Sequence, residues 1–137
     1  MPERVVLFRI GESFFSLPFS HVEEIVSTER VVRRAALPDD VKPIDDNSEE
    51  WVFTREEWLP IGQLLAGINA SSGEQVLMLK RKGRTGAYFV DQVLGIETLP
   101  KSRPLPESAR RCTDYPFSGL LIWKDRIVLE LDLSRLI

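Results

Sequence analysis

The stretch RVVLFRIGESFFSL, residues 4–17, decides how the chain folds at its start. Two runs rich in β-branched and aromatic residues, which favour strands, flank the pair Gly11-Glu12. Glycine at the first central position suits a type II′ turn, because it accepts a positive φ without a Cβ clash. The sequence therefore predicts a β-hairpin with strands over 4–10 and 13–17.

Similar short hydrophobic runs recur between turn residues along the rest of the chain. In the last run, Ile127, Leu129 and Leu131 alternate with Arg126 and Glu130, as is typical of a half-buried strand. Further strands are predicted over residues 51–54, 57–61, 75–81, 85–90, 92–98, 119–123 and 126–131.

Brief helical segments are expected between these strands. Ser20 and Glu23 have the spacing of a capping box, in which each side chain serves a free backbone N–H of the first turn. Val22, Ile25 and Val26 then fall at i, i+3 and i+4, which predicts one apolar stripe on a short helix. Other short helical segments are expected over residues 62–66 and after Asp132.

The loops divide the strands into two groups. Residues 38–50 carry six acids, one lysine and two prolines, and residues 100–117 hold four prolines, so both are predicted to be irregular. About nine short strands without a long helix indicate a mainly β fold of two small barrels. We expect one domain over residues 1–137, with sub-barrels over about 1–50 plus 118–137 and about 51–117.

The composition argues against an enzyme. The chain has 137 residues, one histidine (His21) and one cysteine (Cys112), with no glycine-rich phosphate loop or metal-spaced ligand cluster. We therefore predict no catalytic residue, no cofactor and no metal site. The net charge of −3 gives no general attraction to nucleic acid or anionic membrane, and a cytoplasmic location is expected.

The order of these elements resembles that of the CheW-like domain, the coupling domain of bacterial chemotaxis-type signalling. The opening FRIGESFFSLPFSHVEEIV resembles the family's strand, glycine turn, strand and helix ending in Val-x-Glu-Ile, here Val22, Glu24 and Ile25. The segment WVFTREEWLPIGQLL is similar to the family's arginine and proline segment, with Arg55 and Pro60 on those two positions.

Two later segments extend the resemblance over nearly the whole chain. AYFVDQVLGIETLP is similar to the family's Val-Asp-x-Val strand pair, here Val90, Asp91 and Val93. GLLIWKDRIVLELDLSRLI resembles the closing hairpin and helix. The resemblance implies two packed, five-stranded SH3-like barrels, with the C-terminal part completing the first barrel.

The resemblance also implies a function in docking. Family members join a histidine kinase to chemoreceptor tips, and Val22, Glu24 and Arg55 match motif positions associated with partner contact. An arginine and a glutamate on adjacent exposed elements can fix orientation by charge complementarity. The alternatives are a surface ion pair between Glu24 and Arg55 without a partner, and a core position for Val22.

Two tryptophans flank Arg55. Trp51 and Trp58 are not easily both buried in an alternating hairpin, and one exposed tryptophan beside Arg55 would make a binding hot spot. We therefore include Trp58 among the predicted partner-binding residues, with Arg55, Glu24 and Val22.

Departures from the family pattern leave other functions open. Glu56 stands where the family has glycine and Gln63 where it has aspartate, which is compatible with a specialised relative that keeps one partner contact. A small nucleic-acid-binding barrel that uses the basic turn 80–84 is the alternative from another class. That turn lacks interleaved aromatic residues, which favours a solvated hairpin tip. His21 has no catalytic partner in a recognisable motif and is interpreted as a surface residue.

Overall fold

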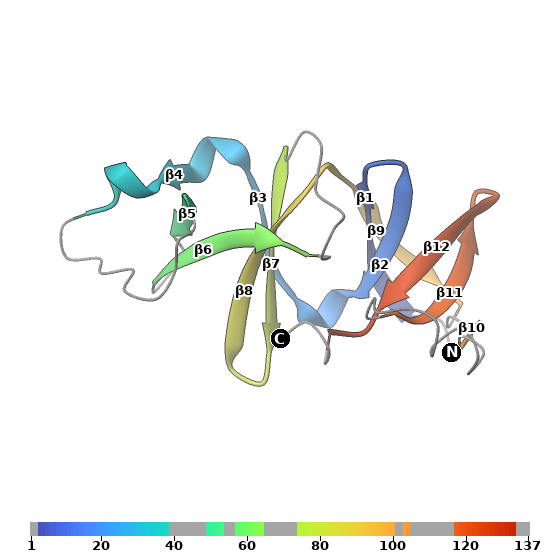
Figure 1. Cartoon of the computed structure of the whole chain (residues 1–137). Helices are drawn as coiled ribbons and strands as arrows, with labels where there is room; N and C mark the ends of the chain where they lie inside the picture. The colour runs from blue at the N-terminus through green and yellow to red at the C-terminus, as the bar shows by residue number, and fades with distance from the viewer. Residues whose placement is uncertain are drawn as a thin grey trace.

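The computed structural model describes residues 3–38, 49–53, 57–64, 74–100, 103–104 and 117–133. These residues form two sheets that lie side by side (Figure 1). The first sheet has the order β10-β11-β12-β2-β1-β9 and consists of β1 (Glu3–Ile10), β2 (Ser13–Pro18), β9 (Gln92–Leu99), β10 (Arg103–Pro104), β11 (Phe117–Trp123) and β12 (Arg126–Leu131).

The second sheet has the order β3-β7-β8-β6-β5-β4. Its strands are β3 (Val22–Ser27), β4 (Val31–Arg33), β5 (Glu50–Phe53), β6 (Trp58–Gln63), β7 (Gln75–Arg81) and β8 (Arg84–Val90). In the described part of the chain the only helical segments are the 3-10 turns η1 (Phe19–His21), η2 (Thr28–Arg30) and η3 (Arg34–Ala36). The mainly β class predicted from the sequence is thus confirmed.

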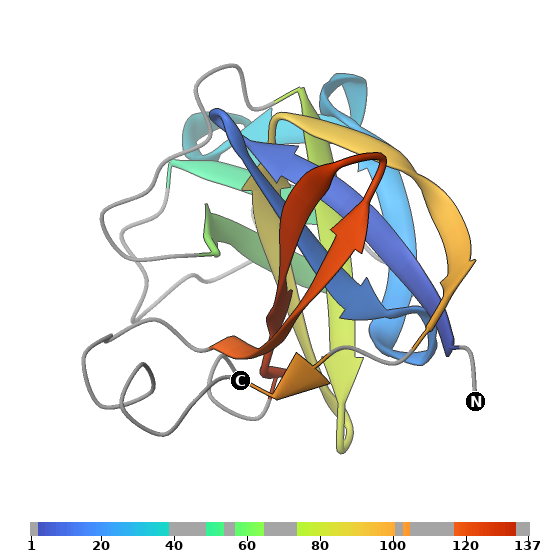
Figure 2. The same cartoon turned by 90° about the vertical axis from the view of Figure 1, so that its right-hand side faces the viewer.

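The division of strands between the sheets differs from the expected sub-barrels. Residues 22–33, expected with the first barrel, form β3 and β4 of the second sheet, whereas 92–99, expected with the second, pair with β1. After β2 the chain passes through η1 into the second sheet, and it returns to the first sheet at β9. The chain thus crosses between the sheets twice. Figure 2 shows β11 and β12 in front of the strands of the second sheet.

The first predicted hairpin is confirmed. Strands β1 and β2 pair antiparallel from Val5↔Pro18 to Ile10↔Ser13. Gly11 has φ +61°, and Glu12 has no positive φ, as a type II′ turn requires.

A buried carboxylate fixes this turn to the rest of the fold. Asp91, between β8 and β9, is fully buried, and its Oδ2 accepts a hydrogen bond of 2.5 Å from the Gly11 N–H. The Asp91 N–H donates to the Arg9 carbonyl at 3.0 Å, and Arg9 Nη1 donates to the Gly11 carbonyl at 2.6 Å. The family-motif aspartate therefore has a structural role, because it joins the β1–β2 turn to a segment 80 residues away.

The helix predicted over residues 20–26 is wrong. The chain forms the 3-10 turn η1 and then strand β3, which pairs with β7. The register shifts between Val22 and Glu24, so one extra residue separates Val22 from Ile25 and imitates a helical spacing. Ile25 and Val26 then face opposite sides of a strand that is covered on both. The expected Ser20 cap is absent, since Pro18 occupies the N-cap position and makes no side-chain cap bond.

Two smaller expectations are also corrected. Gly62 and Gln63, expected in a helical turn, extend β6 and pair parallel with β8. In β12 the expected burial of Leu131 is confirmed, but Ile127, expected inside, is 64% exposed, and Val128 is fully buried in its place. The predicted features that lie outside the described residues are Arg55, Cys112, most of 38–50 and 100–117, residues 65–66 and the helix after Leu133.

Three clusters of buried side chains hold the two sheets. One lies inside the first sheet around Val5, Leu7 and Val128, and one inside the second around Val52 and Val76. The largest joins the two sheets through residues of β1, β2, β7, β8 and β12, namely Phe8, Ile10, Phe15, Leu17, Leu77, Leu79, Val90 and Leu131. This shared core, with Phe8 and Phe15 stacked at 5.7 Å, makes the sheets one packed unit.

Candidate docking site

The predicted partner-binding residues come from strands that are not neighbours in the second sheet. Val22 and Glu24 lie on β3, at one end of the strand order, and Trp58 lies on β6, near the other end. Arg55 lies outside the described residues. The structure connects Glu24 to Trp58 through two residues that the sequence did not single out, Arg30 and Phe53.

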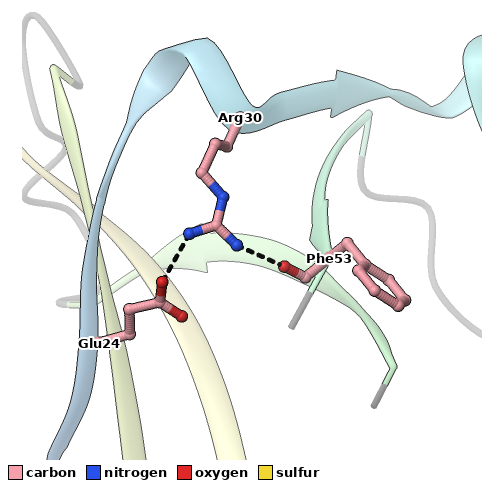
Figure 3. A network of polar contacts seen from close by, with 3 residues as sticks. All are labelled: Glu24, Arg30 and Phe53. Atoms are coloured by element: carbon pink, nitrogen blue, oxygen red, sulfur yellow. Dashed lines mark hydrogen bonds and ion pairs between the residues drawn. The ribbon is translucent and has the colours of Figure 1, made fainter. Parts of the chain in front are cut away.

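Arg30 spans the gap between β3 and β5 (Figure 3). Its Nη1 donates to Glu24 Oε1 at 2.5 Å, and its Nη2 donates to the Phe53 carbonyl at 3.0 Å. Arg30 is the last residue of η2, which directly follows β3, and it immediately precedes Val31, which pairs with Val52. One guanidinium thus links the edge strand β3 to β5, the neighbour of the other edge strand β4, by hydrogen bonds of its side chain.

The aromatic part of the site continues from Phe53. Phe53 pairs with Trp58 across the β5–β6 hairpin, and their ring centroids are 5.2 Å apart at an interplanar angle of 53°. Phe53 is 45% exposed and Trp58 is half-buried, whereas Trp51 is only 4% exposed. As expected, Trp51 and Trp58 are not both fully buried, but neither is exposed, and Phe53 provides the exposed aromatic surface beside Trp58.

We call Glu24, Arg30, Phe53 and Trp58 the charged-aromatic face. The Arg30 and Glu24 side chains are 47% and 37% exposed, so their ion pair contributes only about 0–1 kcal/mol to stability. Exposed aromatic and arginine side chains are, in contrast, the types that dominate binding energy at interfaces. The charged-aromatic face therefore adds little to stability through its ion pair and exposes side-chain types that are common at protein interfaces.

Val22 has a mainly structural position. It is half-buried and packs, with Ile25, against the core that joins the two sheets. A partner contact at Val22 would involve only its exposed part, so the core alternative for this residue is the better one.

A second exposed apolar feature lies on the first sheet. Ile122 and Ile127 are paired across the β11–β12 hairpin and are 61% and 64% exposed. A groove of about 380 Å³ adjoins this pair and is lined by Leu99, Pro100, Arg103, Leu120, Leu121 and Ile122. We call Ile122 and Ile127 the isoleucine face. The alternation of the sequence predicted that Ile127 faces the interior. The exposure of its side chain depends instead on which side of β12 the neighbouring sheet covers.

No cluster of three or more His, Cys, Asp or Glu side chains among the described residues could hold a metal ion. His21 Nδ1 lies 3.3 Å from the Lys80 carbonyl, which accepts a hydrogen bond when that nitrogen carries the proton. Across the described segments, no helix has the length and apolar character needed to cross a bilayer.

Comparison with known proteins agrees with this architecture. The family model for the CheW-like domain matches residues 4–137. The chain belongs to the CheW-like domain family. The crystal structure of the scaffolding protein TtCheW from Thermoanaerobacter tengcongensis superposes with a TM-score of 0.68 at 16% identity, covering 96% of this chain and 90% of that one. No curated protein sequence matches this CheW-like chain significantly.

Proposed function

We propose that this CheW-like protein is a non-enzymatic cytoplasmic adaptor that couples a chemotaxis-type receptor to a histidine kinase. Family membership over residues 4–137 supports a scaffold role in chemotaxis signalling. The observation that carries the proposal is the presence of two separate exposed faces, one on each sheet. An adaptor needs two docking surfaces, and these two exposed faces are our candidates for them.

The charged groups of the charged-aromatic face, Glu24 and Arg30, already form an ion pair with each other. Glu24 accepts from Arg30, so a partner cation that uses Glu24 must displace that guanidinium. A partner carboxylate can instead bind Arg30 beside the exposed Phe53 ring. Arg30→Gln separates these cases: binding strengthens if Glu24 is the contact group and weakens if Arg30 is.

The test of coupling is direct titration of the protein with a receptor cytoplasmic tip and with a kinase regulatory domain. Phe53→Ser should weaken binding of one partner about 10-fold or more, as is typical of an interface hot spot, and spare the other. Glu23→Gln, an exposed acid on the same strand as Glu24, is the control and should bind like the unchanged protein.

The second face is tested with the same two partners. Ile122→Ser with Ile127→Ser should weaken the partner that Phe53→Ser spares, whereas Ile96→Ser, an exposed isoleucine on β9, is the control. Arg55→Ala remains a prediction from the family resemblance: weaker partner binding with nearly unchanged thermal stability. If none of these variants alters either titration, the proposed faces are wrong.

The same experiment decides a second candidate, a specialised relative with one partner contact. Glu56 and Gln63 replace residues of the family segment around Arg55, which favours this version. Binding of both the receptor tip and the kinase domain supports full coupling, and binding of only one supports the specialised form.

A further inference from the structure

The β7–β8 turn has a composition that does not suit its geometry. Arg81 and Arg84 are the last paired residues, and Lys82 and Gly83 connect them with φ values of 50° and 78°. Such a type I′ turn favours Asn or Gly at its first position, because a lysine Cβ is disfavoured in the left-handed region. Like charges directly across a strand pair, here Arg81 and Arg84, are also destabilising.

The cations of this turn face solvent. Lys80, Lys82 and Arg84 are exposed, and none of the three makes an ion pair within the described residues. Arg81 is only half-exposed and lines a cavity of about 210 Å³ whose other lining residues include Glu130 and Asp132. In both views the end of the β7–β8 hairpin extends below the other strands (Figures 1 and 2). We call Lys80, Lys82 and Arg84 the basic tip.

The unfavourable positive φ of the exposed Lys82 is a reason to look for a function at this turn. We propose that the basic tip is a docking site for an acidic segment of a partner protein, separate from the charged-aromatic and isoleucine faces. The tip concentrates three cations within five residues on a two-stranded arm. Arg84 pairs with Arg81, so Lys80 and Arg84 lie on opposite faces of the hairpin. A short run of Asp and Glu side chains that wraps round the end of the hairpin could contact all three cations.

The remaining charge of the chain favours a short acidic segment over an extended polyanion. The net charge is −3, so without the three tip cations the rest of the chain carries −3 − 3 = −6. A nucleic acid or an anionic bilayer that touched the tip would also face that negative body. Residues 80–85 contain no aromatic ring on which a base could stack.

Lys82→Asn is the decisive variant, because it separates folding from binding. Asparagine suits the turn and removes one cation, so the variant should melt at a higher temperature and yet bind acid less well. The probe is a fluorescein-labelled peptide of six glutamates spaced by serines, measured by anisotropy at about 10 mM salt, where the screening length is about 30 Å. The matching peptide with six glutamines should not bind.

We expect Lys82→Asn to weaken peptide binding about 2- to 5-fold, the range for one exposed ion pair. Lys80→Gln with Lys82→Asn and Arg84→Gln should abolish binding. The matched control is Lys124→Asn, at the same position of the β11–β12 turn with φ 47°, which removes an equal charge and should leave binding unchanged.

Three results would overturn the proposal. The first is no binding of the glutamate peptide, and the second is an equal loss for Lys82→Asn and Lys124→Asn, which would indicate attraction by net charge alone. The third is tighter tip-dependent binding of a 20-nucleotide oligothymidylate or of phosphatidylglycerol vesicles than of the peptide. None of these assays contains a receptor or a kinase, so the outcome is independent of the proposed coupling function.

Discussion

Removing the Asp91 carboxylate should be among the most damaging single changes to this fold. In Asp91→Ala, the half-buried Gly11 N–H loses the fully buried carboxylate oxygen that accepts from it at 2.5 Å. A hydrogen bond to a charged group contributes about 1.5–3 kcal/mol to stability. We expect a loss of about 2–3 kcal/mol in the free energy of unfolding.

The size of the effect makes it easy to measure. For a chain of this length, 1 kcal/mol shifts the melting temperature by about 3–5 °C, so Asp91→Ala should melt about 6–15 °C lower. Asp91→Asn keeps an oxygen that can accept from Gly11 and should lose less than half as much. The Asp91 N–H bond to Arg9 is a backbone bond and persists in both variants. A melting temperature within 1 °C of the unchanged protein would refute this account of the turn.

Three further predictions concern the packing of individual side chains. The Ser16 hydroxyl is fully buried without a hydrogen-bond partner among the described residues. Ser16→Ala should therefore raise the free energy of unfolding, measured in urea, by about 1 kcal/mol. A clear loss of stability would indicate that the hydroxyl has a partner. A Cβ at position 86 would lie 2.7 Å from Tyr88 Oη, so Gly86→Ala should cost about 1–3 kcal/mol, and much less when Tyr88→Leu is also present. Burial raises the pKa of Tyr88 above its ordinary 10, so the folded state favours the neutral phenol. The contribution of Tyr88 to the free energy of unfolding is therefore fully present below pH 10 and is lost as the pH rises through the pKa of the folded state. Tyr88→Phe should flatten this alkaline decline when unfolding is measured as a function of pH.

Local chemistry made the hairpins predictable. The turn at Gly11 needs one residue with positive φ between two β-rich runs, and the sequence provides all three features within 14 residues. The strands of β7, β8, β11 and β12 follow from the same kind of short-range pattern.

Helix and strand were confused where a register shift altered the periodicity. Val22, Ile25 and Val26 have helical spacing in the sequence, but the shift in β3 and the burial of both its faces produce that spacing in a strand. Pairing with β7, whose residues lie 48 (Ser27↔Gln75) to 57 (Val22↔Leu79) positions further along the chain, determines the outcome. The β-branched side chains of this segment were the local signal that favoured a strand.

The residues of the candidate docking site were predicted only in part. Glu24 and Trp58 were named from the resemblance and from residue type, whereas Arg30 and Phe53 matter because of a contact between positions 23 residues apart. Ile127 was assigned to the interior by alternation, but Val128 faces the cluster of the first sheet instead. Exposure at a hairpin tip depends on where a neighbouring sheet ends, which is a property of the packed fold.

A shared fold at low identity constrains the interior of the molecule more than its exposed faces. At 16% identity, the similarity to TtCheW in fold is compatible with an order of strands and turns and an apolar interior that many sequences satisfy. Exposed residues such as Ile122 and Ile127 are free of that constraint. A side chain such as Ile127, 64% exposed on a strand whose next residue fills the core, gains little in the monomer. Its burial against a partner is the step that would make that position favourable.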